Sequence, residues 1–234
     1  DMEEADHDDA DHEHEGDEHD MEEADHDDAD HEHEGDEHHT DEAHHEDPDP
    51  GHSHDHGGYD PHVWFDPNNI AQWVENTVET FSALDPENAA AYRENGNAYI
   101  EQLQELDEWI RQETERISPE ERELVTDHMA FSYFAAQYDF DMIGAVIPAY
   151  STSAQPSAQE LAELIDTIQE LDVQAIFVGT SANSSLSEQA AEDTGVKLLP
   201  LYTGSLSDSE GPASTYIDLM RYNVDAIVSG LSGS

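Results

Sequence analysis

Cysteine is absent from this 234-residue chain, and basic residues are scarce. Without thiols the protein has no disulfide, no thiolate metal site and no cysteine nucleophile. Six Lys and Arg residues stand against 59 Asp and Glu residues, and the formal net charge is −53 with histidine neutral. Such a chain repels nucleic acids and anionic membrane surfaces, so we expect neither as a partner, whereas it attracts cations.

Long apolar runs and the common catalytic motifs are also missing. No stretch approaches the roughly 20 apolar residues that span a bilayer. No signal-peptide pattern precedes Asp1, so we expect a fragment of a longer protein. The chain has no glycine-rich phosphate loop, HExxH or GxSxG motif. Serine-rich stretches at 181–187 and 205–209 leave a serine triad with His128 conceivable, but no serine has the strand–turn–helix setting of a nucleophile.

The first 58 residues form a region of their own. Residues 1–60 contain 29 of the 59 acidic residues and 14 of the 16 histidines, and apolar side chains are nearly missing before Tyr59. The 19-residue sequence at 1–19 is repeated at 20–38. So polar a segment buries too little surface to offset the entropy of ordering, and we predict that residues 1–58 are a disordered, acidic, His-rich low-complexity segment.

The histidines of this segment favour weak metal binding. An acidic spacer suited to high salt would explain the Asp and Glu residues but not the 14 histidines. The rest of the chain is also acidic and contains a single lysine, and a surface adapted to high salt explains this composition. The histidines that we predict as auxiliary weak ligands are His31, His33, His38, His39, His44, His45, His52, His54 and His56.

Two helices are expected directly after this segment. Asp66-Pro67 signals a helix start, and apolar residues spaced by three and four predict a helix over 69–84. Asp85-Pro86 opens a second helix that could run to residue 117. At 1.5 Å per residue this helix would be roughly 45 Å long, which suits a strut between two lobes.

The remainder, residues 118–234, has the pattern of an α/β lobe. Short apolar runs predict strands at 124–126, 142–147, 175–178 and 196–201, and helical periods between and after them predict helices at 131–138, 158–171, 186–194 and 215–231. Strands that alternate with helices predict a four-stranded parallel sheet covered by helices on both faces.

Ligands bind such sheets beyond the carboxyl ends of the strands. His128 follows the first predicted strand, while Asp208 and Glu210 follow the last, so metal-competent side chains come to one edge. A helix-capping or edge histidine is an equally good interpretation of His128 from position alone. His62 lies in DPHVWFDP, where proline and large aromatic residues frame one imidazole, a setting that suits a transition metal. His62 could also simply be the last histidine of the rich segment.

Several stretches resemble the zinc/manganese solute-binding proteins of ABC importers. They are DPHVWFDP at 60–67, DPENAAAYRENGNAYIEQLQELD at 85–107, VTDHMAFSYFAAQYDF at 125–140, PSAQELAELI at 156–165 and LYTGSLSDSEGPASTYIDLMRYN at 201–223. The resemblance covers residues 60–234 in order. An acidic His-rich loop directly before DPHVW is typical of the zinc branch.

The resemblance implies two α/β lobes joined by a long rigid helix, with one metal ion in the cleft between them. Residues 59–84 would then be the end of an N-terminal lobe that is otherwise missing, 85–117 the linking helix and 118–234 the C-terminal lobe.

The resemblance makes His62 and His128 metal ligands and places a third histidine in the missing lobe. Three imidazoles favour Zn²⁺ over Mn²⁺, because Mn²⁺ prefers carboxylates. The fourth ligand stays open: Gly204 stands where many relatives have Asp, so Asp208, Glu210 or a water could complete the site. Gly179 is another departure, where relatives often carry Glu.

We therefore expect an extracytoplasmic Zn²⁺ receptor that delivers the metal to the permease of an ABC importer and performs no chemistry. The resemblance implies an extracellular or periplasm-like location, with an N-terminal lipid anchor in the full-length protein, and we expect a monomer. The alternative is a zinc storage, buffering or adhesion module that acts through the His-rich segment. A metallohydrolase is a distant third interpretation.

Overall fold

The computed structural model describes residues 59–181 and 183–232, all of which belong to one structural unit. The predictions made for residues 1–58, including the weak histidine ligands, lie outside the described residues. Within the described residues, no helix is both long enough and apolar enough to cross a membrane.

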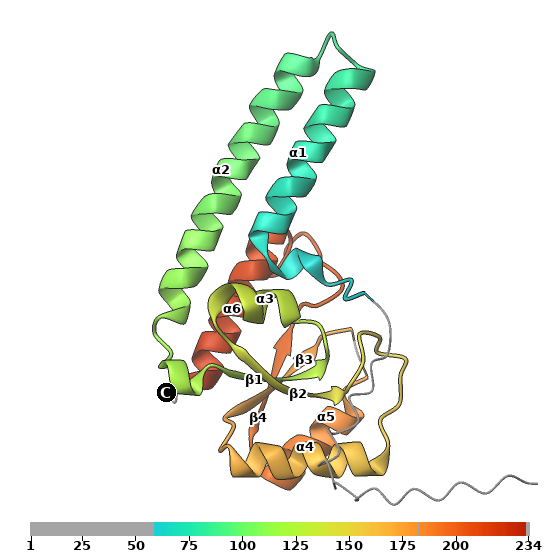
Figure 1. The fold of residues 1–234 in the computed structure, drawn as a ribbon, viewed down its shortest axis with the longest axis vertical. Helices are drawn as coiled ribbons and strands as arrows, with labels where there is room; N and C mark the ends of the chain where they lie inside the picture. Colours follow the sequence, from blue (N-terminus) through green and yellow to red (C-terminus); the bar gives the residue numbers. More distant parts are fainter. Residues whose placement is uncertain (1–58, 182, 233–234) are drawn as a thin grey trace, which may run out of the picture. The chain divides into compact units, whose positions relative to one another are not determined.

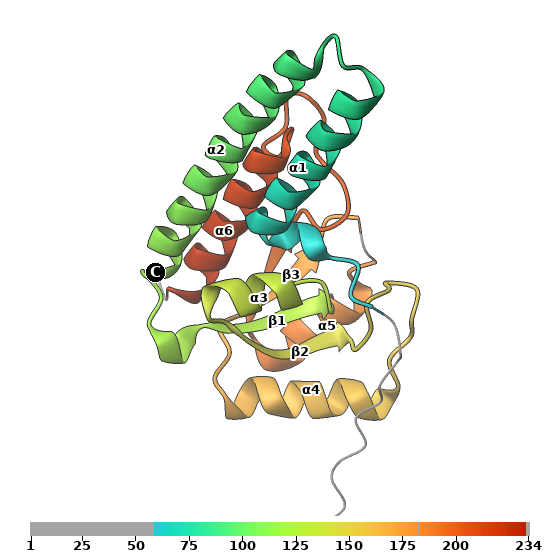
Figure 2. The same cartoon turned by 45° about the horizontal axis from the view of Figure 1, so that its top comes forward.

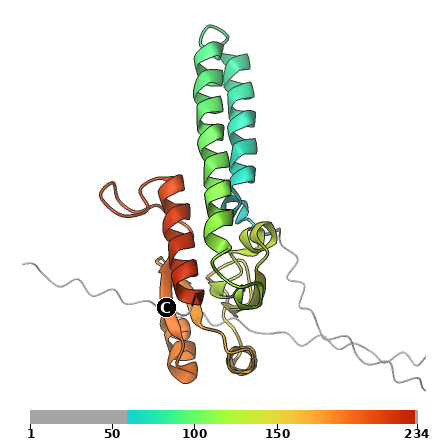
Figure 3. The ribbon, with the colours of Figure 1, turned by 90° about the vertical axis from the view of Figure 1, so that its left-hand side faces the viewer.

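Two antiparallel helices precede the sheet (Figure 1). Helix α1 spans Pro67–Leu84, and the Asp66 side chain caps it by accepting a hydrogen bond from the Asn68 amide. Helix α2 spans Ala89–Thr114. It begins later than residue 85 because 85–88 form a turn in which the Asn88 amide donates to the Asp85 carbonyl. The lower half of α2 also packs on helix α6, Tyr216–Leu231 (Figure 3).

The sheet has four parallel strands, as predicted. They are β1 Glu123–His128, β2 Asp141–Ile147, β3 Ala175–Gly179 and β4 Lys197–Leu201, in the order β2-β1-β3-β4. Every residue of β3 is buried, which accounts for its continuous apolar run. The register pairs His128 with Ile147 and Gly179 with Leu201, so the carboxyl ends of all four strands meet at one edge.

Helices cover both faces of this sheet (Figure 2). Helices α4 (Ala158–Glu170) and α5 (Ser185–Thr194) pack on one face, and α2, α3 (Ser132–Tyr138) and α6 pack on the other. Neighbouring residues of a strand point to opposite faces. Leu124 accordingly enters the aromatic cluster with α3 and α6, whereas Val125 packs with α4 and α5.

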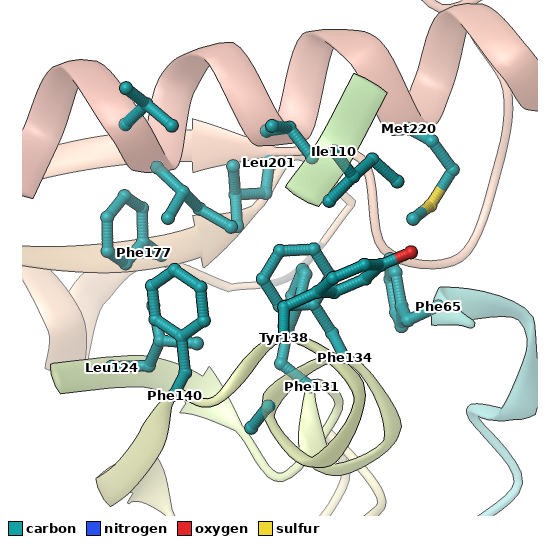
Figure 4. Close-up of a cluster of buried hydrophobic side chains, with 14 of the residues drawn as sticks. Phe65, Ile110, Leu124, Phe131, Phe134, Tyr138, Phe140, Phe177, Leu201 and Met220 are labelled. Atoms are coloured by element: carbon teal, nitrogen blue, oxygen red, sulfur yellow. The ribbon is translucent and has the colours of Figure 1, made fainter. Parts of the chain in front are cut away.

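The larger core lies on the α3 and α6 side (Figure 4). Phe131, Phe134, Tyr138 and Phe140 contribute its aromatic side chains from α3 and its flanks. Phe65 enters the same core from the 3₁₀ turn Val63–Phe65, ahead of α1, and stacks on Phe131 with ring centroids 4.2 Å apart. This contact fixes the segment around His62 on the lobe.

Gly96 sets the distance between α1 and α2. A Cβ atom at this position would lie 2.3 Å from Val78 Cγ2, closer than two carbon atoms that are not bonded to each other can approach.

We predict that Gly96→Ala destabilises the protein, because overpacking costs roughly 1–3 kcal/mol while the gain in helix propensity is about 1 kcal/mol. In a Val78→Ala background the same change should stabilise it, because only the propensity gain remains. Urea unfolding of the four proteins, followed by circular dichroism, measures both effects, and equal effects of Gly96→Ala in both backgrounds would contradict this packing.

Candidate metal centre

The structure brings His62 and His128 together, although 65 residues separate them in the chain. His62 lies directly before the 3₁₀ turn Val63–Phe65, and His128 is the last residue of β1. Their ring centroids are 5.1 Å apart, with the ring planes at 67°. Both residues are buried, with 6% and 4% of their surfaces exposed. Two imidazoles at this separation can share one metal ion.

Each imidazole is held by an aspartate close by in the chain. Asp60 Oδ1 lies 2.9 Å from the backbone nitrogen of His62 and 2.8 Å from its Nδ1. Asp127 Oδ1 lies 2.9 Å from the backbone nitrogen of His128 and 2.8 Å from its Nδ1. Neither aspartate was expected from the sequence to have this role. The available signal was an Asp one or two residues before each histidine, since carboxylates commonly orient metal-binding histidines.

Asp127 also connects the site to β3. Its Oδ2 accepts a hydrogen bond of 3.0 Å from the Gly179 amide. A Cβ atom at Gly179 would lie 2.4 Å from Thr203 Oγ1 and 3.2 Å from Asp127 Oδ2, so no side chain fits there without rearrangement. The ends of β1, β3 and β4 approach one another closely here, which explains why residue 179 is a glycine.

Aromatic side chains surround His62. The Trp64 ring meets the His62 ring edge-on at 5.2 Å, and the Tyr150 ring lies 6.5 Å away. Trp64 Nε1 donates to the Thr203 carbonyl at 3.2 Å, and the Tyr216 hydroxyl donates to the Trp64 carbonyl at 2.8 Å. The loop after β4 is thereby anchored beside the histidine pair.

The two acidic candidates on that loop do not join the pair. Asp208 and Glu210 are exposed, and Asp208 Oδ1 accepts from the Glu210 amide within a local turn. Across 59–181 and 183–232, no group of three or more His, Asp or Glu side chains is arranged to hold a metal ion. A Cβ atom at Gly204 would make only an ordinary van der Waals contact, at 3.9 Å from Ser181 Oγ. The described residues therefore bring together two side chains that can bind a metal ion through nitrogen, His62 and His128.

Comparison with known proteins identifies the family. A family model described as the periplasmic component A of a zinc-uptake complex, ZnuA, matches residues 2–230. The chain belongs to the ZnuA family. The resemblance and the fold class stated from the sequence are thus confirmed.

Relatives of the ZnuA family with different metals in their names are similar to this chain. The manganese-binding lipoprotein MntA of Halalkalibacterium halodurans is 36% identical over 176 residues, which are 75% of this chain and 58% of the relative. The high-affinity zinc uptake system protein ZnuA of Bacillus subtilis is 33% identical over 174 residues, which are 74% of this chain and 53% of the relative. The chain thus spans little more than half the length of these relatives.

The fold matches solved structures of the same kind. The periplasmic zinc-binding protein TroA of Treponema pallidum superposes with a TM-score of 0.69 at 28% identity, over 75% of this chain and 65% of TroA. A manganese-bound periplasmic metal-binding protein of Candidatus Liberibacter asiaticus gives a TM-score of 0.68 at 28% identity, over 76% of this chain and 66% of that one.

Burial favours the neutral form of His62 in this ZnuA-family chain. Desolvation lowers the pKa of His62 below its usual value, and the nearby His128 lowers it further, while the hydrogen bond and charge of Asp60 act in the opposite direction. Neutral imidazole is the form that binds a metal ion, so a lowered pKa keeps His62 ready to bind at mildly acidic pH.

This shift predicts how the metal-free protein responds to acid. The folded state resists protonation of His62, whereas in the unfolded chain the residue titrates near its ordinary pKa of 6.5. The unfolded state therefore binds more protons between the lowered folded pKa and 6.5, and stability falls as the pH falls through this window. His62→Gln should remove that contribution. Urea unfolding in chelator from about pH 7.5 to about pH 5 measures the difference between the two proteins, and parallel pH profiles would contradict the prediction.

Proposed function

We propose that this chain is part of an extracytoplasmic receptor that binds Zn²⁺ and delivers it to the permease of an ABC importer. The observation that carries the proposal is the buried pair of His62 and His128, each fixed by its own aspartate. Capture and release only form and break coordination bonds, so the proposed receptor performs no reaction.

Zinc is the proposed cargo because the paired side chains are both imidazoles. Zn²⁺ accepts nitrogen ligands readily, whereas Mn²⁺ favours carboxylate and other oxygen ligands. The carboxylates of Asp60 and Asp127 contact the rings at Nδ1 and are thus engaged as hydrogen-bond acceptors. Relatives carry either metal in their names, so we propose Zn²⁺ as the preferred cargo and Mn²⁺ as the weaker one.

Two imidazoles fill half of a tetrahedral zinc site. We propose that a third histidine comes from an N-terminal lobe of which 59–84 form the last part, and that Asp208, Glu210 or a water provides the fourth ligand. Two observations support a covering lobe. Asp60 Oδ2 is buried without a hydrogen-bond partner among the described residues. Helix α1 exposes large apolar side chains, with Trp73 and Phe81 each 50% and Leu84 77% exposed.

Two of these side chains, Trp73 and Phe81, border a groove between α1 and α2. Its volume is about 380 Å³, and its walls include Ile70, Val74, Tyr92 and Tyr99. Residues 85–117, which include α2, would link the proposed lobe to the C-terminal lobe, 118–234. We further propose a monomer outside the cytoplasm, tethered by a lipid at the N-terminus of the full-length protein, as the lipoprotein names of relatives suggest.

Zinc titration calorimetry on the full-length protein in high salt tests the binding site. We expect one tight site, which His62→Ala and His128→Ala each weaken by more than the roughly 100-fold that loss of an outer-shell partner costs. The same titrations with Asp208→Asn and Glu210→Gln identify the fourth ligand, since of these two exposed residues we expect only the one that coordinates the metal to weaken the site when it is substituted. Competition with Mn²⁺ tests the metal preference. A tight site that survives both histidine substitutions would overturn the proposal.

Deletion of residues 1–58 separates the receptor from the alternative function. The segment contains 14 histidines, which favours a second candidate, zinc storage, buffering or adhesion through weak sites. For a receptor we expect the deletion to remove several weak zinc sites and to leave the tight one unchanged, because His62 and His128 remain. Calorimetry of the shortened and complete proteins shows which sites are lost. Loss of all tight binding would instead assign the function to the His-rich segment.

A further inference from the structure

We infer that Asp60 and Asp127 are positioning residues, which hold His62 and His128 as Nδ1–H tautomers and present Nε2 of both rings to one divalent metal ion. The metal part of this inference rests on the proposed function. The tautomers follow from contacts that are independent of it.

The hydrogen-bond partners decide the tautomer. At each site one carboxylate oxygen faces both the backbone nitrogen and the Nδ1 atom of the same histidine, at 2.8–2.9 Å. A backbone N–H only donates, so the oxygen is an acceptor. Nδ1 must then carry the proton that it donates to the same oxygen. The remaining nitrogen, Nε2, keeps its lone pair, which is the form that coordinates a metal.

Burial makes this arrangement strong at both sites. The His62 and Asp60 side chains are 8% and 9% exposed, and those of His128 and Asp127 are 6% and 4% exposed. Little water reaches these hydrogen bonds, and in such surroundings their electrostatic strength increases. Rotation of either ring would leave a buried carboxylate oxygen without its Nδ1 donor, which costs more than the loss of an exposed hydrogen bond.

The two aspartates differ in their second oxygen. Asp127 Oδ2 accepts from the Gly179 amide, whereas Asp60 Oδ2 has no partner among the residues that the structure describes. An asparagine at position 60 can therefore keep its oxygen toward His62 and place its NH₂ group where no donor competes. An asparagine at position 127 cannot satisfy both sides, because its NH₂ group would face either the Gly179 amide or both the backbone N–H and the ring of His128.

Because the two aspartates differ in this way, substitution by asparagine should affect the histidine tautomer differently at positions 60 and 127. Asp60→Asn should keep His62 as the Nδ1–H tautomer. Asp127→Asn should loosen the hold on His128, because its NH₂ group opposes a backbone N–H in either orientation, that of Gly179 or that of His128, and His128 should then no longer be held only as the Nδ1–H tautomer. Asp60→Ala and Asp127→Ala should release the ring beside them. A merely structural role for the aspartates would not move the tautomers in this pattern.

Long-range ¹H–¹⁵N NMR of the metal-free, full-length protein with ¹⁵N-labelled histidine reads the tautomers. The signals of the two rings are identified by their loss in His62→Gln and His128→Gln. We expect Nδ1–H at both rings in the unsubstituted protein and the pattern above in the variants. Amide spectra confirm that each variant is folded, and the asparagine variants serve if an alanine variant does not fold. An Nε2–H tautomer at either ring of the unsubstituted protein would overturn the inference.

Zinc titration of the same proteins tests the positioning role. We expect Asp60→Ala and Asp127→Ala to weaken the tight site by roughly 10- to 100-fold, and Asp60→Asn to weaken it less than Asp60→Ala. Unchanged affinity in both alanine variants would overturn the positioning role. An unsubstituted protein that binds no zinc would overturn the proposed function instead, and the tautomers, which are measured without metal, distinguish that failure from this one.

Discussion

The site depends on the stacking of Phe65 on Phe131. The two rings are buried, and each stands three residues after one of the paired histidines. Besides this contact, the segment from Tyr59 to Asp66 is held by hydrogen bonds through Trp64 and by the ring contacts of His62 with His128 and Tyr150. Burial of two large aromatic side chains contributes several kcal/mol in total, so the hydrophobic core itself brings the two imidazoles together.

Polar contacts then refine the position that the core sets. The Asp127 carboxylate joins His128 to the end of β3, and the close approach of Thr203 to Gly179 brings the end of β4 to the same place. His128 is consequently fixed as the last residue of β1 and, through Asp127, to the end of β3. His62 is held by one aspartate and an aromatic surround, so the two halves of the pair differ in rigidity. A metal ion bound between them would join a rigid element to a more adaptable one.

The arrangement of the parallel strands explains why the described residues place candidate metal ligands on one side only. Parallel strands end at one edge of the sheet, and a single edge lines one side of a cleft. Both histidines lie on that side, and α1, which leads away from the sheet (Figure 1), exposes large apolar side chains. A lobe that covered α1 would close the opposite side and exclude water, which strengthens coordination and hydrogen bonding in the site.

Local patterns in the sequence determined the secondary structure and the fold class. Apolar runs and helical periods predicted the four parallel strands and the helices between them, because these signals depend on neighbouring residues. Strand order in turn placed His128 at the ligand-binding edge. Only the resemblance linked His62 to it, because the periodicity of a chain carries no information on which distant segments pack together. The tertiary structure alone decided that Asp60 and Asp127 hold the two rings, and that Asp208 and Glu210 turn to solvent. Although each aspartate is close to its histidine in the chain, the surrounding fold determines which side chains are buried and therefore which conformations they adopt.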